Sequence, residues 1–216
     1  MLLAIDTSTR MLGLGLHSGE RVLAETIWQT NRHHTVELSP QIALLLRRSG
    51  VSTSDLTAIA VAVGPGSYTG LRIGMAMAKG LAYARGLKLV GVSTFDILVH
   101  AQPARPEPIL ALIEAGRGKV AGLWYKWGRR AWSSSGEAIH LTWEELPGIV
   151  EEKSYFIGDI DPVLHKELDT YELIEVALPS ICVRRPSVLA EIAFKRIRTG
   201  KLPATQSLVP VYLKNP

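Results

Sequence analysis

The chain's strongest local signal for chemistry is the glycine-rich segment Gly64–Gly70 (GPGSYTG), which lies between an apolar run and a long helical pattern. A strand-to-helix turn of this composition exposes backbone N–H groups at a helix N-terminus, where proteins bind phosphate. It is not a Walker loop, because no Lys-Ser or Lys-Thr pair follows its last glycine. Nor is it a nucleophile elbow, because Pro65 and Thr69 replace the glycines needed on either side of Ser67. Taken alone, the pattern favours a tight structural turn over a phosphate site.

A second polar turn, Asp6-Thr7-Ser8-Thr9, ends the apolar run Met1–Ile5. In kinases of the ASKHA class, whose fold is actin-like and RNase H-like, a turn in this position binds phosphate and its acidic residue holds magnesium. Phosphoryl transfer would also need a second acidic residue, and none follows the apolar run Leu56–Val63. In the alternative interpretation, Asp6 and Thr7 satisfy N–H groups of the turn itself. The candidate positions of a vestigial nucleotide or phosphate turn are Asp6, Thr7, Ser8, Gly64, Gly66 and Ser67.

The six histidines do not form a metal-binding pattern. His33 and His34 are adjacent, and neighbouring side chains on a helix point about 100° apart, so they cannot easily chelate one ion. We therefore expect no metal site, no cofactor and no catalytic residue. The remaining histidines lack carboxylate partners at ligand spacing: His17, His100, His140 and His165.

The composition is typical of a soluble globular protein. The 216 residues are 47% hydrophobic, and no run approaches the roughly 20 apolar residues of a membrane span. Cys182 is the only cysteine and lies in an apolar run, so a reducing, cytoplasmic setting is expected. The net charge of +4 is dispersed, which favours an ordinary solvated surface. Direct binding of a polyanion such as tRNA stays open through Arg184, Arg185, Lys195, Arg196 and Arg198.

Hydrophobic periodicity predicts how the first half of the chain positions these turns. Short apolar or alternating runs indicate strands, and apolar residues at helical spacing indicate helices. The order of three strands, helix, strand, helix, strand is that of one half of an ASKHA domain, with a mixed sheet flanked by helices. The expected elements are Met1–Ile5, Leu12–Leu16, Arg21–Trp28, Thr35–Arg48, Leu56–Val63, Leu71–Arg85 and Lys88–Val92.

A proline-rich stretch separates the two halves of the chain. Pro103, Pro106 and Pro108 crowd this stretch, and prolines mark loops and boundaries. We therefore expect an N-terminal ASKHA subdomain over residues 1–102 and a smaller ASKHA-like subdomain over residues 103–216.

The second half carries weaker signals, and residues 128–180 are the hardest to order. The runs Ile109–Ile113 and Val120–Trp127 predict a hairpin, and Tyr155–Gly158 predicts a further strand. A last helix is expected after Pro186, with Ser187 as its N-cap and Gly200 as its C-terminal stop.

The helices Thr35–Arg48 and Leu71–Arg85 carry more apolar surface than one sheet can bury. The second has a stripe of large apolar residues beside a stripe of small ones, which indicates a second packing partner. In the alternative, the first helix covers the extra stripe within the same chain. The expected interface with another subunit consists of Leu38, Ile42, Leu45, Leu46, Tyr68, Gly70, Leu71, Gly74, Met77, Ala78, Leu81 and Ala82.

Five segments carry a resemblance to a known family: Leu3–Ser8, His34-Thr35 with Leu38 and Pro40, Gly64–Gly74, Gly91–Thr94 and Pro210–Lys214. Their residues and spacing resemble those of the TsaB family, also called YeaZ. The resemblance implies two ASKHA-like subdomains and a partner subunit, TsaD, that transfers threonylcarbamoyl to tRNA adenosine next to the anticodon. It also implies a third component, the ATPase TsaE, tRNA contact through the complex, and a homodimer through the same two helices.

One departure from the related TsaD pattern implies a subunit without chemistry of its own. TsaD holds its metal with two histidines, and the matching positions here are Thr94 and Leu98, neither of which offers an imidazole. We therefore expect a non-catalytic subunit that binds TsaD and activates or stabilises it. The competing hypothesis is an ASKHA ATPase or phosphotransferase that uses Asp6 and the turn Gly64–Gly70.

Overall fold

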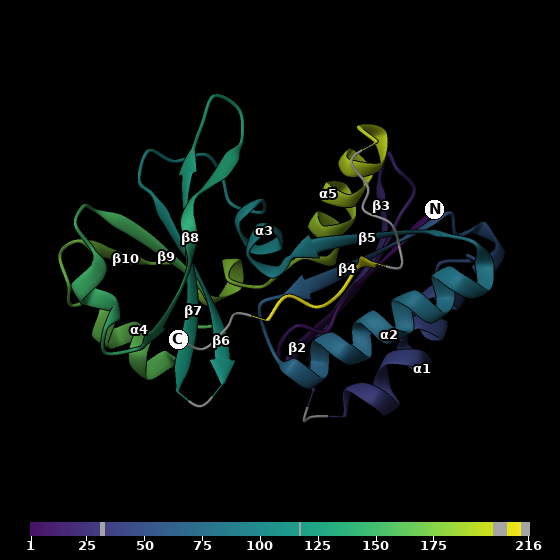
Figure 1. Cartoon of the computed structure of the whole chain (residues 1–216), viewed down its shortest axis with the longest axis horizontal. Helices are drawn as coiled ribbons and strands as arrows, with labels where there is room; N and C mark the ends of the chain where they lie inside the picture. The colour runs from purple at the N-terminus through teal and green to yellow at the C-terminus, as the bar shows by residue number, and fades with distance from the viewer. Residues whose placement is uncertain (31–32, 117, 201–206, 213–216) are drawn as a thin grey trace. The chain divides into compact units, whose positions relative to one another are not determined.

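The computed structural model describes residues 1–30, 33–116, 118–200 and 207–212. The described chain divides into two units, one of Met1–Ile97 with Arg184–Tyr212 and the other of Leu98–Val183 (Figure 1). The change of unit after Ile97 lies close to the boundary expected at residue 102. Residues 184–200 and 207–212, however, belong to the first unit, because α5 (Pro186–Arg198) within them packs on the first sheet. No helix among the described residues is long and apolar enough to cross a membrane.

The first unit contains a five-stranded mixed sheet with the order β3-β2-β1-β4-β5. Its antiparallel part is β1 (Leu2–Asp6), β2 (Met11–His17) and β3 (Val22–Gln29). The remaining strands, β4 (Ala58–Gly64) and β5 (Lys88–Ser93), run parallel to β1. The predicted order of three strands, helix, strand, helix, strand is confirmed.

Helices cover both faces of this sheet (Figure 1). On one face lie α1 (His34–Arg48) and α2 (Tyr68–Arg85). A short 3-10 helix, η1 (Thr53–Asp55), follows α1 and leads into β4. α2 begins at the N-cap Ser67, whose side chain accepts from the N–H of Gly70, and ends at Gly86, whose φ of 62° is favourable for glycine. The opposite face carries α5 (Pro186–Arg198).

Residue size alternates along the strands and decides which helix each face accepts. Leu3 and Ile5 point into the cluster formed with α1 and α2, whereas Ala4 points into the cluster formed with α5. On the α5 face, Gly13 leaves room for Pro186, because a Cβ at Gly13 would lie 2.5 Å from the proline ring. Small residues of β1, β2 and β4 on this face therefore let α5 approach the sheet closely.

The second unit repeats the same strand order, three antiparallel strands and then two parallel ones, as β8-β7-β6-β9-β10. The predicted hairpin of its first two strands is confirmed, although Arg117 at its tip lies outside the described residues. Two sheets of one topology, flanked by helices, confirm the expected ASKHA class. The elements from residue 94 to residue 181 are α3 (Thr94–Val99), β6 (Ile109–Gly116), β7 (Lys119–Trp127), β8 (Trp132–Thr142), η2 (Leu146–Ile149), β9 (Ser154–Gly158), α4 (Pro162–Leu168), β10 (Ile174–Val176) and η3 (Pro179–Ile181).

Candidate functional site

The glycine-rich turn and the first polar turn lie against each other at the N-terminus of α2. The N–H of Ser67 donates to the carbonyl oxygen of Ser8 over 2.6 Å. Thr7 Oγ1 donates to the carbonyl oxygen of Gly70 over 2.7 Å, and the N–H of Gly70 donates to Ser67 Oγ over 3.2 Å. A Cβ at Gly66 would collide with the backbone of Ser8. The N–H groups of Ser67 and Gly70 are therefore both engaged within the chain.

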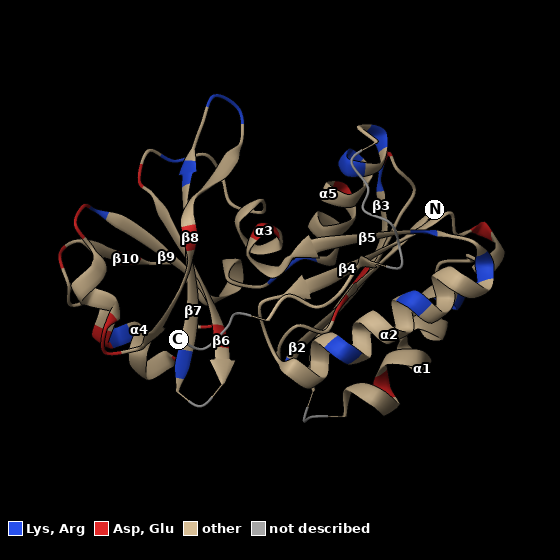
Figure 2. Cartoon of the chain, viewed as in Figure 1, with Lys and Arg blue, Asp and Glu red and all other residues tan. Residues whose placement is uncertain are grey.

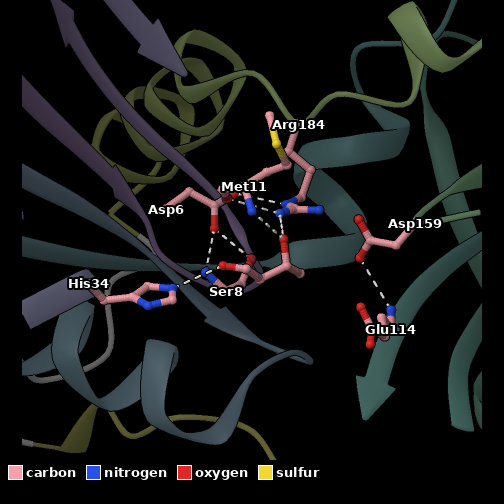
Figure 3. Close-up of polar contacts among 8 residues, drawn as sticks. Asp6, Ser8, Met11, His34, Glu114, Asp159 and Arg184 are labelled. Atoms are coloured by element: carbon pink, nitrogen blue, oxygen red, sulfur yellow. Dashed lines mark hydrogen bonds and ion pairs between the residues drawn. The ribbon is translucent and has the colours of Figure 1, made fainter. Parts of the chain in front are cut away.

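The carboxylate of Asp6 is fully engaged by its neighbours (Figure 3). Its Oδ1 accepts from the N–H of Ser8 over 2.9 Å and from Ser8 Oγ over 2.5 Å. Its Oδ2 accepts from Nε of Arg184 over 2.9 Å, and both side chains of this ion pair are 2% exposed. Arg184 also donates to Thr9 Oγ1 and, over 3.3 Å, to the carbonyl oxygen of Met11. The carboxylate at the position where an ASKHA kinase would hold magnesium is thus buried in an internal ion pair.

The imidazole of His34 is also part of this packing. Its Nε2 lies 3.1 Å from the carbonyl oxygen of Thr9, in a side chain that is buried at the start of α1 (Figure 3). Across the described ranges, no three His, Cys, Asp or Glu residues come together in a way that could hold a metal ion. Thr94 and Leu98, which the resemblance places at the positions of the TsaD metal ligands, are both fully buried. The contact between the His34 ring and the carbonyl oxygen of Thr9 joins the first polar turn to α1.

The twelve residues expected at a subunit interface fall into two groups. Tyr68 is 54% exposed, and Met77 and Leu81 are partly buried against the core cluster that α1 and α2 share. The small-residue stripe faces the chain's own sheet, because a Cβ at Gly74 would collide with the side chain of Thr7. The other nine side chains or glycines are buried in the first unit and are not accessible to another chain: Leu38, Ile42, Leu45, Leu46, Gly70, Leu71, Gly74, Ala78 and Ala82.

This burial corrects the roles of the two stripes on α2. Ile73, Met77 and Leu81 are partly buried against the core cluster that residues of α1, α2 and the sheet form. The accessible surface of the helix pair lies on the opposite, outward side. On that side α1 exposes Val36, Pro40, Ala43 and Arg47, and α2 exposes Thr69, Arg72, Ala76, Gly80, Tyr83 and Ala84.

At the start of α2, an aromatic and cationic cluster holds the end of the described chain. Arg72 Nε donates to the hydroxyl of Tyr212 over 2.9 Å, and its guanidinium lies 3.8 Å from the centre of the Tyr68 ring. The hydrogen bond to Tyr212 raises the pKa of Arg72. The N–H of Val211 donates to the carbonyl oxygen of Val63 over 2.7 Å. Of the family-like ending Pro210–Lys214, residues 213 and 214 lie outside the described residues.

The cationic residues considered for direct tRNA contact are mostly engaged within the first unit. Arg184 pairs with Asp6 in the core, and Arg185 pairs with Glu25. Arg196 contacts Asp96 and the carbonyl oxygen of Gly91. Arg198 donates to the carbonyl oxygen of Gly19 over 3.0 Å. These contacts organise α5 on its sheet, and Lys195 and Arg198 are exposed.

The repeated sheet topology and the closed polar turn define a protein of the ASKHA class, and comparison with known proteins gives the family. The family model described as TsaD, tRNA N6-adenosine threonylcarbamoyltransferase, matches residues 21–173. The tRNA threonylcarbamoyladenosine biosynthesis protein TsaB of Bacillus subtilis is 35% identical over 77% of this chain and 74% of its own length. The TsaB protein of Escherichia coli is 30% identical over 99% of this chain and 94% of its own length.

A solved structure agrees with these relatives over the full fold. YeaZ from Pseudomonas aeruginosa superimposes with a TM-score of 0.77 at 26% sequence identity, covering 98% of this chain and 99% of that one. The chain belongs to the TsaB (YeaZ) family.

Proposed function

We propose that this chain acts in the biosynthesis of threonylcarbamoyladenosine in tRNA as a non-catalytic subunit that binds TsaD and activates or stabilises it. The role in tRNA modification is supported by the family, whose named relatives in Bacillus subtilis and Escherichia coli are threonylcarbamoyladenosine biosynthesis proteins. TsaE would be the third component, and tRNA would be reached through the complex. The setting would be cytoplasmic, where tRNA is modified.

The observation that carries the non-catalytic assignment is the internal occupation of the ASKHA phosphate turn. Asp6 is paired with Arg184, and the glycine-rich turn is closed by Ser8. Freeing the carboxylate would leave the buried Arg184 cation unpaired, which is energetically costly. ATP turnover that requires magnesium and is lost in Asp6→Asn, with the fold intact, would contradict this assignment.

The surface proposed for TsaD is the outward side of α1 and α2. It includes Ala76 and Gly80 at exposed helical positions, where small side chains permit a second helix pair to approach closely. Gly80 lies inside α2, where glycine is unfavourable by about 0.5–1 kcal/mol relative to alanine, so its presence there is better explained by packing than by helix stability. A homodimer would use the same surface and would compete with TsaD.

The test replaces Gly80 by a large neutral side chain. A Cβ at Gly80 meets nothing within 4 Å, so Gly80→Gln should fold normally and still obstruct a partner. Gly148→Gln is the matched control, because Gly148 is equally open and exposed in the second unit. We expect Gly80→Gln to weaken co-elution with TsaD by at least about tenfold and to reduce reconstituted tRNA modification, with the control unchanged. Wild-type binding and modification by Gly80→Gln would contradict the proposed surface.

A further inference from the structure

A cavity of about 460 Å³ lies in the first unit, where the second half of α5 meets the turn between β2 and β3. This volume is within the range of sites that bind small molecules. The cavity is on the α5 side of the first sheet, whereas α1 and α2 pack on the other side, so the surface proposed for TsaD plays no part in it. Its lining includes His17 and Gly19 from the β2 side and Glu191, Phe194, Lys195 and Arg198 from α5.

The imidazole of His17 brings a hydrogen-bond donor to this cavity, although its side chain is only 7% exposed. Nδ1 accepts from the N–H of Gly19 over 2.9 Å, so in the neutral ring the proton is on Nε2. Nε2 lies 3.9 Å from Oε1 of Glu191, which is too far for a hydrogen bond, and it has no other partner in the described part of the chain. Because an unpaired buried donor is costly, a ligand oxygen is expected at this position.

The separation of His17 and Glu191 suits one hydroxyl group. A hydroxyl oxygen can accept from Nε2 of His17 while its proton is donated to the Glu191 carboxylate, because a hydroxyl is both donor and acceptor. Two such bonds of about 2.8–3.0 Å can span atoms that are 3.9 Å apart. An anionic oxygen could also accept from His17, but it would face the charge of Glu191. This end of the cavity therefore favours a neutral hydroxyl.

Two cations of α5 line the same cavity. Lys195 and Arg198 are three residues apart and so share one side of the helix, and both are exposed (Figure 2). Arg198 donates to the carbonyl oxygen of Gly19 over 3.0 Å, which uses one of its five N–H donors. Lys195 follows Glu191 by four residues, a spacing that favours an ion pair, yet among the described residues no carboxylate lies within ion-pair distance of its ammonium. Lysine and arginine are the usual protein ligands of phosphate.

Helix stability explains only part of this arrangement. Cations in the last turn of a helix are favoured by the helix dipole, which accounts for the two cations as local features of α5. It does not account for the buried Nε2 of His17 or for the hollow beside it. Arg196, in the same turn, is held by its own unit, because it contacts Asp96 and the carbonyl oxygen of Gly91.

We infer that this cavity binds a small sugar phosphate. Its phosphate group contacts Lys195 and Arg198, and one of its hydroxyls bridges His17 and the carboxylate of Glu191. Nucleotide sites divide the work in the same way, with an acidic residue on a sugar hydroxyl and cations on phosphate. The ring of Phe194, whose centre lies 5.2 Å from that of the imidazole, supplies an apolar wall.

A free small molecule fits this cavity better than a nucleic acid strand does. Proteins that bind a strand do so with a cationic groove that follows several successive phosphates. Here the cations without carboxylate partners that line the cavity are Lys195 and Arg198, one helical turn apart, which suits a single phosphate group.

The inference goes beyond the proposed function and is tested on the full chain without TsaD. Calorimetry measures the binding of ribose 5-phosphate, inorganic phosphate and a uridine hexanucleotide. Lys195→Gln removes one cation, and Lys166→Gln is the matched control, because Lys166 is an exposed lysine in the last turn of α4. Glu191→Ala removes the carboxylate at an exposed helical position. His17→Asn keeps an acceptor close to Nδ1 and removes Nε2, and circular dichroism checks that it folds.

We expect ribose 5-phosphate to saturate the chain below about 5 mM and inorganic phosphate to bind at least about tenfold more weakly. Lys195→Gln should weaken binding of ribose 5-phosphate about tenfold, with Lys166→Gln unchanged. Glu191→Ala and His17→Asn should also weaken ribose 5-phosphate, whereas Glu191→Ala should strengthen inorganic phosphate because a repulsive charge is removed.

Several results would overturn the inference. They are the lack of saturable binding, equal affinity for the sugar phosphate and inorganic phosphate, equal loss in Lys195→Gln and Lys166→Gln, and undiminished binding of ribose 5-phosphate by Glu191→Ala. Tighter binding of the uridine hexanucleotide than of ribose 5-phosphate would also overturn it. Each of these results would leave the proposed function standing, because that function is measured by association with TsaD.

Discussion

Nε of Arg184 donates to Oδ2 of Asp6 over 2.9 Å, and the two residues are separated by 178 positions in the sequence. Asp6 ends the first strand of the sheet, and Arg184 is the first residue of the segment that returns to the first unit. The pair therefore ties the two chain segments of that unit together while it occupies the carboxylate that a phosphotransferase would need free.

Removing one member of this pair should destabilise the protein more than removing both. Arg184→Met leaves a buried carboxylate without its cation and should cost about 3–5 kcal/mol in the free energy of unfolding. Asp6→Leu/Arg184→Met replaces the pair with apolar side chains and should recover a large part of that loss. Urea unfolding of the wild type, both single variants and the double variant measures the coupling. Additive losses would show that the two side chains do not act as a pair.

Two glycines on the same helix should respond oppositely to alanine. Gly80 is exposed with open space around it, so Gly80→Ala should stabilise the isolated chain by about 0.5–1 kcal/mol through the helix preference for alanine. Gly74 lies against Thr7, and Gly74→Ala should destabilise it by about 1–3 kcal/mol because the side chains overlap. Thermal unfolding of the two variants gives both signs directly. Equal effects would contradict the assignment of the small-residue stripe to the sheet.

The sequence predicts which residues share a helical stripe but not which stripe faces the sheet. Ile73, Met77 and Leu81 form one apolar stripe, and the small residues beginning at Gly70 form another, and either could be buried. The structure buries the small stripe because the turn containing Thr7 lies directly beneath it. Sequence periodicity contains no information about that contact, so it cannot predict which stripe stays accessible to a partner.

Long-range contacts explain where else the structure differs from what the local sequence pattern predicts. The alternation of leucine and glycine in β2 predicts a strand from local pattern alone, and the structure contains it. No local feature of the sequence around Arg184 shows that its side chain forms an ion pair in the core and is not a solvated cation. Ser187 was expected to cap α5, but its hydroxyl donates to Glu25 over 2.8 Å, and the N-cap position is Arg185. The carboxylates in these two contacts, Asp6 and Glu25, come from strands far away in the sequence.

The cluster around Arg72 should control how firmly residues 207–212 hold to the first unit. Tyr212→Ala removes the ring that stacks 4.9 Å from Tyr68 and the hydroxyl that Arg72 contacts. Hydrogen exchange at the Val211 amide, which donates to Val63, should become faster, while exchange in β4 stays unchanged. Tyr212→Phe keeps the ring and should fall between the wild type and Tyr212→Ala. Unchanged exchange at Val211 in Tyr212→Ala would contradict this role.

The attachment of α5 through Glu25 should depend on pH. Burial acts to raise the pKa of Glu25, but hydrogen bonds from Arg185 and Ser187 outweigh it and hold the pKa below the ordinary value of 4.5. A carboxyl group with a lowered pKa in the folded state contributes stability above its unfolded pKa, and that contribution is lost as pH falls through the folded value. The wild type should therefore lose stability on acidification below about pH 4.5, and Glu25→Gln should be less stable at pH 7 and lose less on acidification. Glu20→Gln, an exposed substitution in the turn between β2 and β3, is the matched control. An identical acid dependence in Glu25→Gln and the wild type would show that this carboxylate does not anchor the helix.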